Sequence, residues 1–236
     1  MEKCNCEKCN HKLCAKKVPI FSFLSDDELI KIINMTGNKV YNKGDVLCSQ
    51  GEKSDTLFII NEGQVKISKL TKEGKEQIVH IFTGGDFFGE LSLFSSDELC
   101  NFDAYAISKV KICTLTKQDM DKIIMSNPKI SLKLLQVISK RLSQTENLAQ
   151  NLATNDAEIR IAFMLLEFGE EYGTSTSQGL QINLPINREE MASYVGVTRE
   201  TISRKLSIFE DLGIISLKGN KVLIIKKMDK LRSYVE

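Results

Sequence analysis

The cysteines of this chain are concentrated at its N-terminus. Seven are present, and four of them fall within the first fourteen residues, at Cys4, Cys6, Cys9 and Cys14. A segment this short cannot build a hydrophobic core, so burial does not explain why it carries most of the thiols. Thiolates bind zinc and iron–sulfur clusters, and accessible thiols undergo reversible oxidation. The N-terminal segment is therefore a candidate metal or redox site and the best indication of what the protein senses.

The remaining thiols are spread over the middle of the chain, at Cys48, Cys100 and Cys113. Cys48 ends the apolar run Val46-Leu47-Cys48, and this setting indicates a small buried hydrophobic residue. His80 also lies inside an apolar run, which favours a core histidine over a metal ligand. Cys100 is harder to place from its neighbours.

Spacing alone leaves two alternatives for the N-terminal thiols. The pair Cys6-x2-Cys9 has the spacing of the first half of a zinc site, with His11 close by as a further ligand, but no matching second pair follows. The other alternative is a thiol–disulfide switch, in which an N-terminal cysteine pairs with Cys113 or Cys100 on oxidation. An odd number of cysteines and the lack of an apolar secretory signal argue against a framework of structural disulfides.

Composition limits the classes of function. The chain has 236 residues, 42% hydrophobic and 27% charged, which suits one large or two modest globular domains. No apolar run is long enough to span a membrane, so we expect no membrane partner and a cytoplasmic location. A formal net charge of +1 argues against non-specific coating of nucleic acid, so DNA binding must use a local arrangement of charge. No Ser/His/Asp set, carboxylate pair or nucleotide loop is present, and we do not expect an enzyme.

The patterning predicts the elements that position these residues. Ser25 precedes three acidic residues and an amphipathic run, which predicts a capped helix of about ten residues. Over residues 39–115, short apolar runs alternate with glycines, as in a small all-β barrel or roll. From Ile130 onward apolar residues recur at alternating steps of three and four, typical of a coiled-coil seam. The seam consists of Leu135, Ile138, Leu142, Thr145, Ala149 and Leu152. A helix packed on its own domain would also show a stripe, but its length favours a helix pair in a homodimer.

The C-terminal third has the patterning of a compact domain that ends in a hairpin. Residues 157–168 have a helical pattern, and the Thr/Ser-rich stretch 173–179 is expected to be a loop. The apolar runs 214–217 and 222–225 are joined at Gly219-Asn220, which predicts a β-hairpin wing.

Between that loop and the wing lie the signals of a helix-turn-helix. A capping-box pair at residues 187 and 190 opens a short helix, Gly196 predicts a tight turn, and Thr198 caps a second helix. The second helix has a buried face formed by Ile202, Leu206 and Phe209. Its opposite face carries Arg199, Glu200, Ser203 and Arg204, residue types that contact base edges. Helices and hairpins with charged residues also occur in proteins that never bind DNA. The turn, the cap and the preceding dimer helix together favour a winged helix-turn-helix.

These features resemble the CRP/FNR family of bacterial transcription regulators over almost the whole chain. The resemblance rests on residues 57–66 and Gly85-Asp86-Phe87-Phe88-Gly89-Glu90-Leu91 in the roll, and on residues 197–204, its most specific segment. It implies an α+β protein with an N-terminal cyclic-nucleotide-binding-like β-roll, a long dimerisation helix and a C-terminal winged helix-turn-helix. The expected segments are 1–18 (cysteine-rich), 19–127 (β-roll), 128–153 (dimerisation helix) and 154–236 (DNA-binding domain).

Two branches of this family sense different signals. In the cyclic-AMP branch, an Arg-Ser pair about ten residues after Gly89-Glu90-Leu91 holds the phosphate. This sequence has Cys100-Asn101 there, so we expect no cyclic AMP binding of the usual kind. The oxygen-sensing branch, the fumarate and nitrate reduction regulators, holds a four-iron cluster with an N-terminal cysteine trio and one cysteine of the roll.

Resemblance to the oxygen-sensing branch implies a 4Fe-4S cluster. Its ligands would be Cys6, Cys9, Cys14 and Cys113, with Cys4 as an alternative ligand. The spacing departs from the family's pattern, in which the last N-terminal gap is one residue longer. Such a cluster would tie the N-terminal segment to the roll through Cys113 and bias the helices toward a DNA-competent pairing, and oxygen would remove that tie.

For DNA, the resemblance implies an inverted-repeat site read by both copies of the chain, with RNA polymerase as a further partner. Arg199 and Arg204 can each donate two hydrogen bonds to guanine, Glu200 can accept one from cytosine, and Ser203 can contact a thymine or a phosphate. Glu200, Ser203 and Arg204 resemble the oxygen-sensing branch, whereas Arg199 resembles the cyclic-AMP branch. Both a TTGAT-like and a TGTGA-like half-site therefore remain open.

Overall fold

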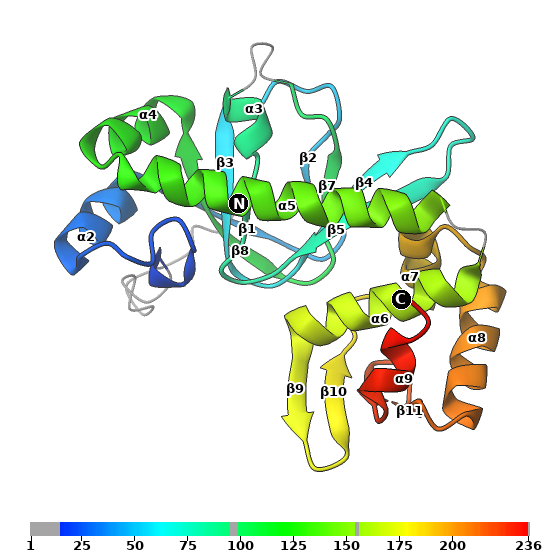
Figure 1. Cartoon of the computed structure of the whole chain (residues 1–236). Helices are drawn as coiled ribbons and strands as arrows, with labels where there is room; N and C mark the ends of the chain where they lie inside the picture. Colours follow the sequence, from blue (N-terminus) through cyan, green and yellow to red (C-terminus); the bar gives the residue numbers. More distant parts are fainter. Residues whose placement is uncertain (1–14, 95–98, 154–155, 236) are drawn as a thin grey trace. The chain divides into compact units, whose positions relative to one another are not determined.

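The computed structural model describes residues 15–94, 99–153 and 156–235 of the chain (Figure 1). Two compact units are formed. The first runs up to Lys69 and continues over Val79–Ser143, and the second comprises Leu70–Ile78 and the chain from Gln144 onward. In the described residues, no helix combines the length and the apolar character that crossing a bilayer requires.

The glycine-punctuated apolar runs fold as the predicted β-roll. One four-stranded sheet has the order β1-β8-β3-β6 and the other the order β2-β7-β4-β5. The strands are β1 (Gly37–Tyr41), β2 (Val46–Cys48), β3 (Thr56–Glu62), β4 (Val65–Leu70), β5 (Glu76–Phe82), β6 (Phe87–Phe88), β7 (Asp103–Ala106) and β8 (Val110–Thr116). Gly63 joins β3 to β4 at a φ of 93°, where a Cβ would lie 2.3 Å from the carbonyl oxygen of Lys109, so the connection requires glycine.

Strand β3 is buried on both faces, which explains its continuous apolar run. Phe58 and Ile60 belong to the inner core, shared with residues of the second sheet. Leu57 and Ile59 belong to the outer core, on the other face of β3. Because successive side chains of a strand point to opposite faces, a strand buried on both sides needs an apolar residue at every position.

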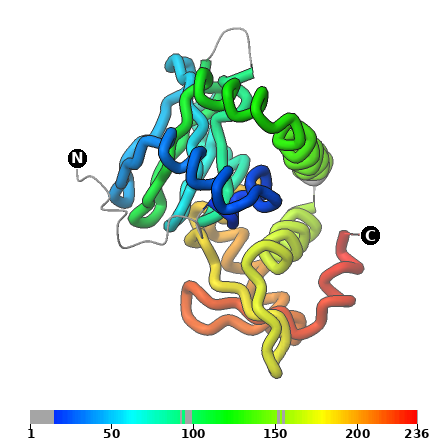
Figure 2. The backbone as a smooth tube through the Cα atoms, turned by 90° about the vertical axis from the view of Figure 1, so that its left-hand side faces the viewer, coloured from blue at the N-terminus to red at the C-terminus, as the bar shows by residue number. Residues whose placement is uncertain are grey.

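Helices cover the outer core. α2 (Asp26–Met35), α4 (Lys117–Ser126) and the start of α5 (Lys129–Ala153) contribute Leu29, Ile123 and Leu134 to it. α2 begins at the predicted cap, where Ser25 Oγ accepts from the N–H of Glu28 and the Glu28 carboxylate accepts from the N–H of Ser25. A short helix, α3 (Glu90–Phe94), follows β6. Figure 2 shows the blue N-terminal helical segments against the strands of the roll.

Helix α5 is the long helix expected over residues 128–153, and it has two apolar faces. Ile130 and Leu134 are buried in the outer core, and Ile138 is partly buried against it. Leu135 and Leu142, both on the predicted seam, are exposed. Of the other seam positions, Thr145 and Ala149 are exposed and the side chain of Leu152 lies outside the described residues. Packing on the roll therefore accounts for one face of α5 and leaves the leucines of the other face exposed on the single chain.

The C-terminal domain combines helices with a four-stranded sheet of order β11-β12-β10-β9. Its elements are α6 (Ala157–Tyr172), β9 (Gly173–Thr176), β10 (Gly179–Asn183), α7 (Arg188–Val195), α8 (Arg199–Asp211), β11 (Ile215–Lys218), β12 (Val222–Ile225) and α9 (Met228–Arg232). The prediction of a loop over residues 173–179 was wrong, because β9 pairs with β10 as an antiparallel hairpin. β9 is a polar edge strand without apolar alternation, and β10, its partner, is held in turn by β12. The α+β fold class, with a β-roll, a long helix and a winged helix-turn-helix, is confirmed.

Candidate functional sites

The predicted helix-turn-helix is formed by α7 and α8. Asn187 caps α7 in a capping box, with its side chain accepting from the N–H groups of Glu189 and Glu190. Gly196 ends α7 in the left-handed conformation, at φ 68° and ψ 44°, as the tight turn requires. Thr198 caps α8 by accepting from the N–H of Thr201. The turn chemistry expected from the sequence is confirmed at each of these positions.

Helix α8 separates its apolar and polar residues as predicted. Ile202, Leu206 and Phe209 are buried on one face. The four predicted DNA-contact residues, Arg199, Glu200, Ser203 and Arg204, are all exposed. Hydrogen bonds from its own backbone N–H and from the Thr198 side chain lower the pKa of Glu200, so its carboxylate is ionised at neutral pH. The first two turns of α8 therefore present two guanidinium donors, one acceptor and one hydroxyl to solvent.

Two charged contacts from α6 hold the helix-turn-helix, and the sequence reasoning missed both. Arg160 donates from Nη1 to the carbonyl oxygens of Val195, at 2.9 Å, and Gly196, at 3.2 Å, the last carbonyls of α7. Lys205 of α8 forms a short ion pair with Glu158. Since Arg160 and Glu158 both lie in the first turn of α6, that turn is joined to both helices of the helix-turn-helix. The sequence around Glu158 and Arg160 does not indicate these contacts, because their partners lie 35 to 47 residues further along the chain.

The predicted wing is formed by β11 and β12, which pair in an antiparallel hairpin. Its turn carries Gly219 at φ 65°. Lys218 and Lys221 flank that turn and are exposed, with Lys218 Nζ donating to Gln178 Oε1 at 3.0 Å. Exposed lysines at a wing tip are suited to phosphate contacts, which add affinity without reading sequence. These two lysines extend the candidate nucleic-acid interface beyond α8.

Cys113 occupies a defined place in the roll. It lies in β8 opposite Asn38 of β1 and Ile59 of β3, and its side chain packs against the outer core. Asn61 Nδ2 donates to Cys113 Sγ at 3.0 Å, and Sγ donates to Asn38 Oδ1 at 3.2 Å. The thiol is half-buried on a rigid strand with two amide neighbours, so it is held in place and remains accessible.

The four N-terminal cysteines, Cys4, Cys6, Cys9 and Cys14, lie outside the described residues. The described chain begins directly after Cys14, and Ala15 packs against the same outer core as Cys113. Val18 and Phe21 continue this packing as fully buried members of that core. No group of three or more His, Cys, Asp or Glu side chains placed to hold a metal occurs within residues 15–94, 99–153 and 156–235.

Cys48 and Cys100 lie together in the inner core. Cys48 is buried, as predicted from its apolar run, and Cys100 is buried beside it with the two Sγ atoms 2.9 Å apart. By its place in the sequence, about ten residues after Gly89-Glu90-Leu91, Cys100 stands where the family resemblance positions a phosphate-binding arginine. No arginine precedes Arg141 in the sequence, so the roll strands offer no substitute for that guanidinium.

Glu90 and Arg141 form a buried ion pair between α3 and α5. Arg141 Nη1 lies 2.7 Å from Glu90 Oε1, and Nη2 donates to the carbonyl oxygen of Phe87 at 2.6 Å. The guanidinium stacks over the rings of Phe82 and Phe87, 4.7 and 4.5 Å from their centroids. Glu90 Oε2 is buried and has no hydrogen-bond partner among the described residues. A ligand with a hydroxyl or amino group would satisfy that oxygen.

His80 lies next to this ion pair. Its ring packs on Phe82 with centroids 4.3 Å apart. Burial, reinforced by the charge of Arg141, lowers the pKa of His80 to about 4, so the imidazole is neutral at physiological pH. His80 is only partly buried and belongs to neither the inner nor the outer core, so it lies at the edge of the packed interior rather than within it.

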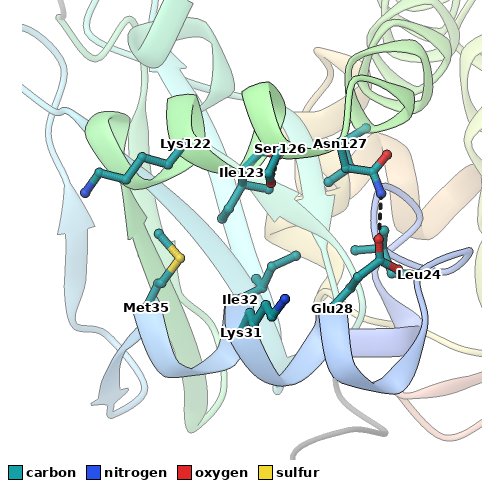
Figure 3. A pocket seen from close by; sticks show the side chains of 10 residues that line it. Leu24, Glu28, Lys31, Ile32, Met35, Lys122, Ile123, Ser126 and Asn127 are labelled. Carbon is teal, nitrogen blue, oxygen red and sulfur yellow. Dashed lines mark hydrogen bonds between the residues drawn. The ribbon is translucent and has the colours of Figure 1, made fainter.

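A pocket of about 330 Å³ opens between α2 and α4 (Figure 3). Its floor is apolar, with Ile32 and Ile123 facing each other, and Lys31 and Lys122 lie at its rim. A hydrogen bond from Asn127 Nδ2 to Glu28 Oε1, 3.0 Å long, closes one end. The residues lining this pocket do not include Cys113 or the exposed face of α8.

Comparison with known proteins matches both parts of the chain. Residues 38–127 match the cyclic nucleotide-binding domain, and residues 159–234 match the Crp-like helix-turn-helix domain. The CRP-like cAMP-activated global transcriptional regulator of Mycobacterium tuberculosis is 33% identical over 184 residues, which are 78% of this chain and 82% of that protein. The probable transcriptional regulator flp of Lacticaseibacillus casei is 28% identical over 92% of this chain and 95% of that protein.

A solved structure shows the same fold. A CooA mutant from Carboxydothermus hydrogenoformans superposes with a TM-score of 0.77 at 24% identity, covering 87% of this chain and 90% of that chain. Both curated relatives are named as transcriptional regulators rather than as enzymes.

Proposed function

The chain belongs to the CRP/FNR family of transcription regulators, and we propose that it binds an inverted-repeat operator as a homodimer and senses oxygen or redox state through its N-terminal cysteines and Cys113. Regulators of this family bind DNA, act as dimers and respond to cyclic nucleotides or other effectors. The observation that carries the DNA-binding proposal is the fully exposed polar face of α8 behind a glycine turn. RNA polymerase is the partner expected at the promoter.

Base readout would come from the first two turns of α8. Arg199 and Arg204 each offer a planar pair of donors for guanine O6 and N7, and the ionised Glu200 accepts from the amino group of cytosine. The helix N-terminus, at Thr198, brings backbone N–H groups toward phosphate. Lys218 and Lys221 of the wing would contact the backbone and fix the register.

Selection of bound duplexes from a randomised pool tests this interface. The wild-type chain is expected to enrich an inverted repeat, because a two-fold dimer presents α8 twice. Arg204→Ala should cost about 1–3 kcal/mol in specific binding and relax one base pair in each half-site. Arg232→Ala is the matched control, since it removes the same charge from an exposed position in α9. Equal losses of operator affinity for the two variants would contradict base reading by Arg204.

Dimerisation through α5 is supported by its second apolar face. Leu135 and Leu142 are separated by one heptad and exposed on the single chain. Exposed leucines in a regular heptad are costly unless a partner covers them, and a second copy of the same helix supplies the matching seam. The pairing of α5 with its copy would set the separation of the two α8 helices.

The sensory proposal rests on the place of Cys113. Its thiol is half-buried on the outer face of β8, and Ala15, the residue after Cys14, packs against the same core. That shared core supports the proposal that the preceding cysteines and Cys113 act together. The residues that would hold a 4Fe-4S cluster are Cys6, Cys9, Cys14 and Cys113, with Cys4 as the alternative.

When bound, a four-iron cluster supplies sensitivity to oxygen. The chain's own residues supply position: the amide of Asn61 donates to Cys113 Sγ and would stabilise a thiolate there. Strand pairing on both sides of β8 keeps that sulfur fixed relative to α2 and α5.

Anaerobic purification with iron and sulfide analysis tests the ligand set. Cys113→Ser and Cys9→Ser are expected to lose iron, whereas Cys4→Ser, the matched control, should retain it. Exposure to air should bleach the visible spectrum of the wild-type chain and lower its affinity for the operator. A colourless, iron-free wild-type protein with intact operator binding would refute the cluster. Loss of that binding on oxidation would then support the thiol–disulfide switch, and equal binding in both atmospheres would refute both.

A second candidate function, binding of a small effector in the roll, is favoured by Glu90. Its Oε2 is buried and without a hydrogen-bond partner in the described structure, beside the Arg141 guanidinium. Cyclic AMP itself is not the expected effector, because Cys100 stands where the phosphate-binding arginine would be and Arg141 already pairs with Glu90. Calorimetric titration with cyclic AMP and cyclic GMP distinguishes the candidates, and micromolar binding of either nucleotide would overturn this expectation.

A further inference from the structure

The buried thiols Cys48 and Cys100 are brought together by the backbone of the roll. Cys48 ends β2 and pairs in register with Ala104 of β7, and Cys100 precedes β7. The segment around Cys100 is held by two backbone hydrogen bonds, from Gly51 N–H to the Cys100 carbonyl oxygen at 2.8 Å and from Cys100 N–H to the Glu52 carbonyl oxygen at 2.9 Å. The pairing of β2 with β7 and these two hydrogen bonds therefore hold the Sγ atoms 2.9 Å apart.

The two thiols lie in an apolar core, but Cys100 also has hydrogen-bond partners there. The inner core supplies apolar neighbours, including Phe102. Cys100 Sγ donates to Cys48 Sγ, and Cys100 also has a hydrogen bond with Ser54. The interaction with Cys48 makes the largest contribution to lowering the pKa of the Cys100 thiol. Its partnership with Cys100, followed by burial, raises the pKa of Cys48. Cys100 is therefore the member of the pair that ionises first.

We propose that Cys48 and Cys100 form a redox modification site in the roll, which hydrogen peroxide or another small hydroperoxide converts reversibly to an intramolecular disulfide. This site is separate from Cys113 and from the N-terminal cysteines, and it extends the chemistry of the chain beyond the proposed function. In a reducing compartment such a bond is transient and reports oxidant.

The chemistry proceeds in two balanced steps. The Cys100 thiolate attacks one peroxide oxygen, the O–O bond breaks, and the departing hydroxide takes a proton to leave as water, giving a sulfenic acid on Cys100. Cys48 Sγ then attacks Cys100 Sγ, the S–O bond breaks, and the hydroxide leaves as water with the Cys48 proton. Two thiols and one peroxide give one disulfide and two waters: the thiols lose two electrons and the peroxide gains them.

Burial selects the oxidant. The exposed fractions are 7% for Cys48 and 3% for Cys100, so a bulky disulfide reagent cannot reach either sulfur in the folded chain. Hydrogen peroxide is about as small as water and can reach sites that larger reagents cannot. The pair should therefore oxidise with peroxide much faster than with glutathione disulfide.

Peptide mapping of the full-length chain tests the proposal directly, because trypsin separates the relevant cysteines. Cleavage after lysine gives residues 44–53 with Cys48, residues 76–109 with Cys100, and residues 112–117 with Cys113. The reduced protein is exposed to hydrogen peroxide, blocked with N-ethylmaleimide in denaturant and digested without reductant. Peptides 44–53 and 76–109 are expected to appear joined, lighter than their sum by two hydrogen atoms, and to separate with dithiothreitol.

Two variants assign the roles. In Cys48→Ala the sulfenic acid on Cys100 has no internal partner and should be trapped by dimedone, a cyclic 1,3-dione. Cys113→Ala, the matched control, should leave the joined peptides unchanged. Recovery of peptide 44–53 only in its maleimide-blocked form, or of peptide 76–109 joined to an N-terminal peptide, would overturn the proposal. The peptide map of the wild-type chain tests the proposal even when a variant fails to fold. Because the map requires neither DNA nor iron, its outcome is independent of the proposed function.

Discussion

Replacement of Arg141 by alanine is expected to destabilise the β-roll by about 3 kcal/mol. The side chain connects α5 to the roll by an ion pair to Glu90, a hydrogen bond to the Phe87 carbonyl oxygen and stacking on two aromatic rings. Alanine removes all three contacts. It also leaves the Glu90 carboxylate without a counterion in a site where its Oε2 already lacks a hydrogen-bond partner within the described structure.

The magnitude follows from burial. The side chains of Glu90 and Arg141 are 9% and 18% exposed, and removing one partner of a buried pair costs about 3–5 kcal/mol because the remaining charge stays buried. The lower end of this range applies because the Arg141 side chain is still partly exposed to solvent. A surface pair in the same unit has a similar N–O separation without the burial: Lys111 Nζ lies 2.6 Å from Glu62 Oε2, and the side chains are 35% and 66% exposed. Lys111→Ala should therefore cost only about 0–1 kcal/mol.

Hydrogen exchange read by mass spectrometry is the appropriate assay, because the chain has two units that need not unfold together. The reporters are the amides of β3 in the roll. Arg141→Ala should raise their opening equilibrium roughly a hundredfold, and Lys111→Ala at most about fivefold. Adding Glu90→Gln to Arg141→Ala should recover much of the loss, since the uncompensated charge is then removed. Similar effects of the two single variants, or no recovery in the double variant, would refute the argument from burial.

Three further predictions concern the helices. Leu142→Glu should convert the dimer to monomer in sedimentation analysis, whereas Leu132→Glu, which changes an off-seam leucine of similar exposure (63% against 58%), should leave it dimeric. Gly196→Ala should destabilise the helix-turn-helix by about 1 kcal/mol, because alanine is strained at φ 68°, and unchanged exchange rates in α7 would contradict this. Burial raises the pKa of Glu167 to about 7 despite its hydrogen bond from Tyr194, whereas in the unfolded chain the group titrates near 4.5. Unfolding free energy of the C-terminal domain should therefore fall as pH rises from about 4.5 to about 7, and Glu167→Gln should abolish that slope in pH-dependent hydrogen exchange of α6.

Local interactions made much of this protein predictable from its sequence. The caps at Ser25, Asn187 and Thr198 are formed by groups three residues apart or fewer, and the structure confirms all three. Gly196 was predictable because a left-handed residue between two helices favours glycine. The polar face of α8 follows from helical periodicity alone. These features are encoded within a few residues of chain, and tertiary packing is not needed to identify them.

Contacts between distant residues were decided only by the tertiary structure. β9 was not predictable because a polar edge strand acquires its hydrogen bonds from a partner strand, not from its own pattern. Arg141 was one polar residue among several on a long helix, until the fold brought it to Glu90, 51 residues earlier in the chain.

The cysteines show the same division. The sequence by itself determined that the thiols gather at the N-terminus and that Cys48 is buried. It did not indicate Cys48 as the neighbour of Cys100, because these residues are 52 positions apart and only the fold brings them side by side. Which residues meet across a sheet depends on its topology and register, and the residues next to a cysteine in the sequence determine neither.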